Sequence, residues 1–111
     1  MSVLNRELDQ RLLNMARRRD MSQDDVRQFA SLCSYAPEAQ LPELLYTCAC
    51  FGNIAGMRML LDHNVDPNFQ GRSDWTALNS CIFNAFKHPE NPVYLLMAHI
   101  LLAKEGVDVN R

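Results

Sequence analysis

The sequence predicts an all-α fold, and two observations carry that prediction. Apolar residues recur at spacings of three and four along the whole 111-residue chain, which is the period of a helix with one buried face. Alternation with a period of two, which marks a half-buried strand, is nearly absent. Because capping and helix-breaking residues interrupt the apolar pattern at short intervals, we expect several short helices joined by turns.

The first two predicted helices lie before Pro37. One of them has an apolar stripe with most of its arginines away from it, and the stripe consists of Leu4, Leu8, Leu12 and Met15. The other begins at Ser22, which with Asp25 three residues later resembles a capping box. Its apolar positions are Val26, Phe29 and Cys33. Pro37 ends this pattern, since proline disfavours helical geometry in the residue before it.

The middle of the chain predicts a second pair of helices. Pro42 suits a first helical turn, so the third helix should run from there to about Phe51. Gly52 interrupts the apolar run, and a fourth helix should extend from about Ile54 to Asn64. Asn64 itself suits the left-handed conformation at a helix end.

Residues 65–75 are rich in turn formers and predict a long loop. Helical spacing resumes at Thr76, with an apolar stripe formed by Leu78, Ile82 and Phe86. After another loop, Asn91 can cap and Pro92 can begin a last helix, which Gly106 ends. The apolar residues of that helix are Leu95, Leu96, Ile100 and Leu101.

Composition and charge indicate a soluble protein of one domain. Apolar residues make up 48% and charged residues 22% of the chain, ordinary values for a globular protein. The net charge of -2 gives no broad electrostatic reason to expect nucleic acid or anionic membrane as a partner. No apolar stretch approaches the ~20 residues of a membrane-spanning helix. Because no signal peptide precedes the cysteines, we expect the protein to be cytoplasmic. In that reducing compartment its four cysteines should be free thiols, and these are Cys33, Cys48, Cys50 and Cys81.

Two segments of the chain line up with each other, as in a helical repeat protein. The first contains, in order, Glu43, Leu45, Ala49, Gly52, Leu60-Leu61 and Val65-Asp66-Pro67-Asn68. The second contains, in the same order, Thr76, Leu78, Leu101-Leu102 and Val107-Asp108-Val109-Asn110. Glu43 and Thr76 are 33 positions apart, which is the repeat length of ankyrin units.

These residues resemble the ankyrin repeat family over about residues 43–110. The resemblance implies a solenoid of stacked helix pairs, with a long hairpin-like finger loop between units. The eight-residue step from Asn68 to Thr76 has the length of that finger. We therefore interpret residues 1–111 as a single domain, made of an N-terminal helical cap or degenerate repeat (1–36), an ankyrin-like unit (41–75) and an ankyrin-like unit with an insertion (76–111).

The chain departs from the family pattern in two ways. Neither unit begins with the usual Thr-Pro-Leu-His, because the corresponding residues are Glu43-Leu44-Leu45-Tyr46 and Thr76-Ala77-Leu78-Asn79. The second unit also holds nine extra residues, most of them around His88 to Pro92, which should lengthen its first helix or the turn after it. Since a helix pair buries its apolar face only by stacking on neighbours, we expect a core that includes both leucine pairs, Cys48, Ala49 and Cys81.

The family binds partners with its finger tips and with the concave face of the first helix of each unit. By resemblance, the binding residues here would be Gln70, Arg72, Ser73 and Trp75 on the loop, Cys50 and Phe51 on one helix, and Phe83 and Asn84 on the next. Trp75 is either an interface anchor or is packed on the helix after Thr76. Phe51 and Phe83 are either core residues or contacts on the concave face.

The sequence therefore predicts a protein–protein interaction module, which binds another protein and is not an enzyme. No phosphate loop, nucleophile elbow or zinc-protease helix is found, and we expect no cofactor. Cys48 and Cys50 would point about 200° apart on a helix, so we expect no metal site. Arg17-Arg18-Arg19 is either a solvated helix end or a targeting or phosphate-binding cluster. Two alternatives stay open: an N-terminal regulatory or targeting part of a longer enzyme or effector, and a small inhibitor or antitoxin that blocks a partner.

Overall fold

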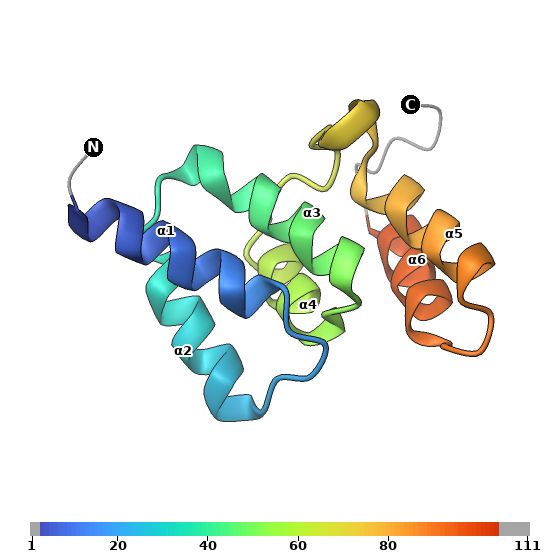
Figure 1. Cartoon of the computed structure of the whole chain (residues 1–111), viewed down its shortest axis with the longest axis horizontal. Coiled ribbons are helices and arrows are strands. Elements are labelled where there is room, and N and C mark those ends of the chain that lie inside the picture. Colours follow the sequence, from blue (N-terminus) through green and yellow to red (C-terminus); the bar gives the residue numbers. More distant parts are fainter. Residues whose placement is uncertain (1–2, 105–111) are drawn as a thin grey trace.

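The computed structural model describes residues 3–104, and of Arg72 and residues 3–5 it describes the backbone alone. This part of the chain contains six α-helices and two short 3-10 helices, and no strand occurs in it (Figure 1). The all-α prediction is confirmed. The elements are α1 (Val3–Ala16), α2 (Gln23–Cys33), η1 (Glu38–Gln40), α3 (Leu41–Phe51), α4 (Ile54–Asp62), η2 (Arg72–Asp74), α5 (Ala77–Lys87) and α6 (Val93–Ala103).

Consecutive helices pack as pairs, α1 with α2, α3 with α4, and α5 with α6. The first helices of the pairs also pack on one another, because α3 contacts both α1 and α5, while α2 contacts α4. The three pairs therefore follow one another in a row, with α3 and α4 in the middle (Figure 1).

Local capping explains where the helices begin and end. The Ser22 hydroxyl accepts a hydrogen bond from the Asp25 amide, and the Asp25 carboxylate accepts one from the Ser22 amide, so the predicted capping box is present. Thr76 and Asn79 form the same reciprocal pair at the start of α5. Gly52 ends α3 with φ of 76°, a left-handed conformation that glycine adopts without steric cost.

Most of the predicted helix ends are confirmed. Asn64 follows the end of α4 with φ of 60°, the left-handed conformation expected for it. The side chain of Asn91 accepts a hydrogen bond from the first amide of α6 at 3.1 Å. The last helix ends at Ala103, whereas Gly106 and the repeat match at 107–110 lie outside the described residues.

The loop between α4 and α5 turns back on itself without the strands of the hairpin finger that the resemblance implies. The Gly71 amide donates a hydrogen bond to the Trp75 carbonyl at 2.7 Å and closes the turn. Inside it, Ser73 and Asp74 both have positive φ, 56° and 61°. Two successive left-handed residues cannot continue an extended strand. The loop is consequently a compact turn instead of a hairpin of strands.

Each of the six α-helices contributes to one hydrophobic core. Both leucines of the first pair, Leu60 and Leu61, are buried as predicted, and so is Leu101. The predicted core positions Cys48, Ala49 and Cys81 are fully buried as well. The largest fully buried side chains are Leu12, Phe29, Leu44, Leu45, Met57, Leu60, Met97 and Leu101.

One core prediction is wrong. Leu102 is 51% exposed, although its counterpart Leu61 in the preceding pair is buried. Of the stripe that predicted α5, Leu78 is buried, but Ile82 and Phe86 are exposed. The physical reason is position in the row, because within residues 3–104 no helix pair follows α5 and α6.

The extra residues of the second unit lengthen its turn and move the end of its first helix, although α3 and α5 both have 11 residues. Asn84 corresponds to Phe51, the last residue of α3, yet α5 continues for three more residues to Lys87. The turn then occupies residues 88–92, whereas residues 52–53 suffice between α3 and α4. This extension of α5 places Phe86 beyond the part of the helix that the repeat pattern accounts for.

A buried asparagine fastens the first helix pair to the second. Asn53 is fully buried, and its side-chain nitrogen donates to the carbonyls of Met15 at 3.1 Å and Ala16 at 3.3 Å. Its side-chain oxygen accepts from the amide of Gly56 at 2.9 Å and so caps α4. One side chain thus joins the C-terminal end of α1 to the N-terminal end of α4.

Candidate protein-binding surface

A groove of about 660 Å³ lies between α1, α3 and the loop before α5. We call it the inner groove. Because α3 packs on α1 through one side and carries the loop on the other, residues far apart in sequence meet there. Its lining consists of Leu13, Arg17, Glu43, Tyr46, Thr47, Cys50, Phe51, Phe69, Gln70 and Gly71.

Aromatic rings hold the loop against α3 inside this groove. Tyr46 and Phe69 pack edge to face, with ring centroids 6.0 Å apart. Gly71 lies so close to α3 that a β-carbon there would come within 2.4 Å of the Tyr46 ring. The absence of a side chain at Gly71 is therefore what allows the loop to approach α3 and form one wall of the groove.

The inner groove also carries charged side chains, and the sign of their charge differs between the two ends of α3. The guanidinium carbon of Arg17 lies 6.0 Å from the centroid of the Phe51 ring, within the range of a cation–π contact. Phe51 is the last residue of α3, whereas Glu43 lies in its first turn. The groove is therefore basic toward the end of α3 and acidic toward its start.

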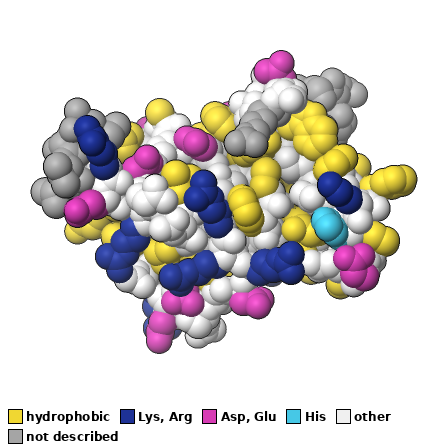
Figure 2. Space-filling model, in the orientation of Figure 1, with side chains coloured by type: hydrophobic (Ala, Val, Ile, Leu, Met, Phe, Trp, Pro, Cys, Tyr) yellow, Lys and Arg dark blue, Asp and Glu magenta, His cyan; other side chains and the backbone are white. Residues whose placement is uncertain are grey.

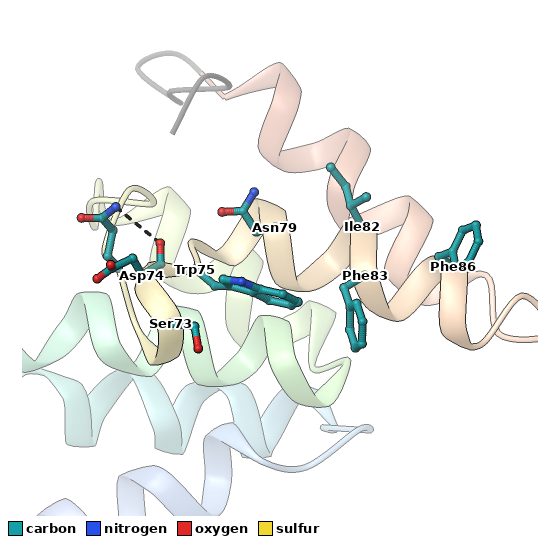
Figure 3. Close-up of a pocket in the computed structure, with 8 residues that line it drawn as sticks. Ser73, Asp74, Trp75, Asn79, Ile82, Phe83 and Phe86 are labelled. Atoms are coloured by element: carbon teal, nitrogen blue, oxygen red, sulfur yellow. Dashed lines mark hydrogen bonds between the residues drawn. The ribbon is translucent and has the colours of Figure 1, made fainter.

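A second groove, of about 670 Å³, lies on the other side of the loop, along α5 (Figure 3). We call it the end groove. Trp75 packs edge to face on Phe83 there, with ring centroids 5.0 Å apart. The ammonium of Lys87 lies 5.6 Å from the centroid of the same Phe83 ring. The lining consists of Gln70, Ser73, Asp74, Trp75, Asn79, Ile82, Phe83 and Phe86.

The structure divides the predicted binding residues between the two grooves. Cys50 and Phe51 line the inner groove, Ser73, Trp75 and Phe83 line the end groove, and Gln70 lines both. Asn84 is half-buried and lines neither of them. The side chain of Arg72 lies outside the described part of the structure.

The structure bears on the alternatives stated for Trp75 and for Phe51 and Phe83. Trp75 is half-buried and packs on Phe83, which is the contact with the following helix that one of the two interpretations predicts. Phe51 and Phe83 are 45% and 46% exposed, so neither is a core residue. Tyr46 and Phe69, which also line the inner groove, were not among the predicted binding residues. Phe69 is an aromatic residue within a loop of turn formers, as Trp75 is, and this signal could have identified it.

The four cysteines are unpaired, and their surroundings differ. Burial raises the pKa of the Cys33 thiol to about 11 and that of Cys81 to about 12. Burial also raises the pKa of Cys48. Only Cys50 is partly exposed, in the inner groove. Among the described residues, no three His, Cys, Asp or Glu side chains are grouped so that they could hold a metal ion.

These differences predict selective modification of Cys50. The thiolate is the reactive form, and a rise of the pKa by two units lowers its fraction about a hundredfold. We expect iodoacetamide at pH 8 to label Cys50 in the folded protein and the other cysteines only after unfolding in urea. Peptide mass spectrometry measures this, with Cys50→Ser as the control. Equal labelling of Cys48 and Cys50 before unfolding would contradict the burial described here.

In the comparisons with known proteins, no family model, no curated protein and no solved structure matches this chain. The resemblance to ankyrin repeats consequently stays a prediction. No helix among those described is both long enough and apolar enough to cross a membrane.

Proposed function

We propose that this chain is an ankyrin-like protein-interaction domain and that its partner binds in the inner groove and against the adjoining loop. The packing order of the helices supports a repeat architecture, because α1, α3 and α5 contact one another in sequence. Stacked repeats use a surface made of such neighbouring helices and loops to bind partners. In this interpretation α1 and α2 are the N-terminal cap or degenerate repeat.

The composition of the inner groove carries the proposal. Tyr46, Phe51 and Phe69 line it together with Arg17. Aromatic and arginine side chains are the types enriched at the centres of protein interfaces. Phe51 is 45% exposed, although an apolar ring of this size is normally buried in a chain that acts alone. A partner that covers Phe51 would remove this surface from water.

The charges of the groove indicate what the partner presents. Arg17 forms a cation–π contact with Phe51, whereas Arg18 forms an ion pair with Asp25 and Arg27 forms one with Asp24. We expect an acidic group of the partner near Arg17 and a basic group near Glu43, flanking an apolar side chain that contacts Phe51. Trp75 and Phe83 border this surface beyond the loop.

Affinity capture from cell extract tests the proposal. The baits are the wild-type protein, Phe51→Ala and Tyr35→Ala, each checked for folding by circular dichroism. Tyr35 is a matched control, because it is an aromatic residue that is 75% exposed but lies outside the groove, in the turn after α2. We expect one set of proteins to be bound by the wild type and by Tyr35→Ala and to be lost with Phe51→Ala. A set that Phe51→Ala retains in full would show that the proposed surface is wrong.

A further inference from the structure

The first helices of the three pairs end on the same side of the molecule. In Figure 1, α1, α3 and α5 lie side by side and run in the same direction, and α3 packs on both of the others. One contact shows how α3 and α5 meet, because the Sγ of Cys50 lies 3.6 Å from the Oγ of Ser80. Phe51 follows Cys50 directly, and Phe83 lies about one helical turn after Ser80. The two phenylalanines therefore flank the junction of α3 and α5.

Each of these phenylalanines is half-exposed and has a basic side chain over its ring. Arg17 follows the end of α1, and its guanidinium carbon lies 6.0 Å from the centroid of Phe51. Lys87 is the last residue of α5, and its ammonium lies 5.6 Å from the centroid of Phe83. Figure 2 shows basic side chains over the end of α1 and over α5, with hydrophobic side chains between them. We call Arg17, Phe51, Phe83 and Lys87 the cationic strip.

The two cations of the strip have no acidic partner in the part of the chain that the structure describes. Neither Arg17 nor Lys87 forms an ion pair there, whereas the adjacent Arg18 is paired with Asp25. A guanidinium that stacks on a ring keeps its N–H donors for a carboxylate, and an ammonium has three donors of its own. Because the ring keeps water from one side of the cation, the attraction for a carboxylate is stronger there than in open solvent.

We propose that the partner presents an acidic peptide segment that crosses the cationic strip, with one carboxylate at Arg17, another at Lys87 and apolar side chains on the two phenylalanines. This inference rests on the proposed function, because the segment starts in the inner groove. It adds the class of partner and the path that the partner takes to α5. Axes of packed helices are about 8–10 Å apart, which about three residues of an extended chain span. A short segment therefore reaches both cations.

Acidic side chains at the other end of both grooves select a short acidic segment over a polyanion. Glu43 lines the inner groove in the first turn of α3, and Asp74 lines the end groove just before α5 begins. Nucleic acid carries a charge at every phosphate and would meet these carboxylates as well as the cations. A peptide with few carboxylates can instead place them at the helix ends alone, where the charges are complementary.

Peptide selection tests this proposal. A random library of peptides about 12 residues long, displayed on phage, is selected on the wild-type protein, and the most enriched sequence is synthesised with a fluorescent label. Fluorescence anisotropy then measures its dissociation constant for the wild type, Arg17→Glu, Lys87→Glu, Phe51→Ala and Arg58→Glu. Arg58→Glu is the matched control, because Arg58 is an exposed arginine of α4 that lines neither groove. Circular dichroism verifies that each variant folds.

We expect the enriched peptides to contain at least two acidic residues close to apolar ones. Arg17→Glu and Lys87→Glu should each raise the dissociation constant about tenfold or more, while Arg58→Glu should change it by less than about twofold. Added salt should weaken binding to the wild type and have a smaller effect on either of the first two variants.

Enriched peptides without acidic residues, or a library from which nothing is enriched, would overturn the proposal. An affinity that depends on Arg17 and Phe51 but not on Lys87 would also overturn it, and would leave the inner groove as the binding surface. An acidic peptide whose affinity depends on Lys87 but is unchanged by Phe51→Ala would overturn the proposal together with the proposed function.

Discussion

Leu101→Ala should lower the free energy of unfolding by about 2–5 kcal/mol, whereas Leu102→Ala should lower it by about 1 kcal/mol or less. The two leucines are adjacent in α6 and lose the same atoms on substitution. Leu101 is 0% exposed, so its truncation leaves a cavity in the packed core. Leu102 is half-exposed, and solvent already contacts much of its side chain.

Urea unfolding of both variants measures this difference. Because the substitutions are chemically identical, the comparison removes any general effect of alanine on a helix. Equal losses for Leu101→Ala and Leu102→Ala would mean that α6 is rotated about its axis relative to the structure. They would also contradict the exposure of Leu102 in the structure.

Asn53→Ala should destabilise the protein by about 2–4 kcal/mol. The substitution removes the cap of α4, which contributes about 1 kcal/mol at such positions. It also leaves the buried carbonyl of Ala16 without the partner that Asn53 supplies, at about 1–3 kcal/mol for one buried group. We expect the loss of stability to affect both helix pairs together, because the same side chain joins the first pair to the second.

Thermal and urea unfolding, followed by circular dichroism, measure this loss. Asn14→Ala is the matched control, since Asn14 is exposed and its side chain bonds only to that of Gln10 one turn earlier. We expect that control to stay within about 0.5 kcal/mol of the wild type. A loss for Asn53→Ala no larger than that of Asn14→Ala would contradict the role assigned to the buried asparagine.

The sequence predicts the helices well because their signals are local. The capping box at Ser22, the left-handed Gly52 and Asn64, and the apolar periodicity each act within a few residues of the boundary they set. Burial of Leu60, Leu61 and Leu101 also followed from the expectation that helix pairs bury their leucine pairs by stacking. Helix existence and most helix ends could thus be read before any tertiary contact was known.

Features that depend on distant segments could not be predicted in this way. Asn53 follows Gly52 at the break between two helices, and nothing near it in sequence indicates its hydrogen bonds to Met15 and Ala16. Periodicity placed Ile82 and Phe86 on one stripe, but it does not say whether another helix covers that stripe. The same limit applies to the candidate surface, where Tyr46 and Phe69 meet only because the loop folds back on α3.

The most direct test of the proposed binding surface is the affinity of Phe51→Ala for a captured partner, measured together with its stability. Isothermal titration calorimetry gives the dissociation constant, and urea unfolding of the same preparation gives the free energy of unfolding. We predict that binding weakens about 30-fold, or about 2 kcal/mol, while the free energy of unfolding changes by about 1 kcal/mol or less, because Phe51 is half-exposed in the free chain. Unchanged affinity of the folded protein, with or without a loss of stability, would contradict the assignment of the inner groove as the binding surface.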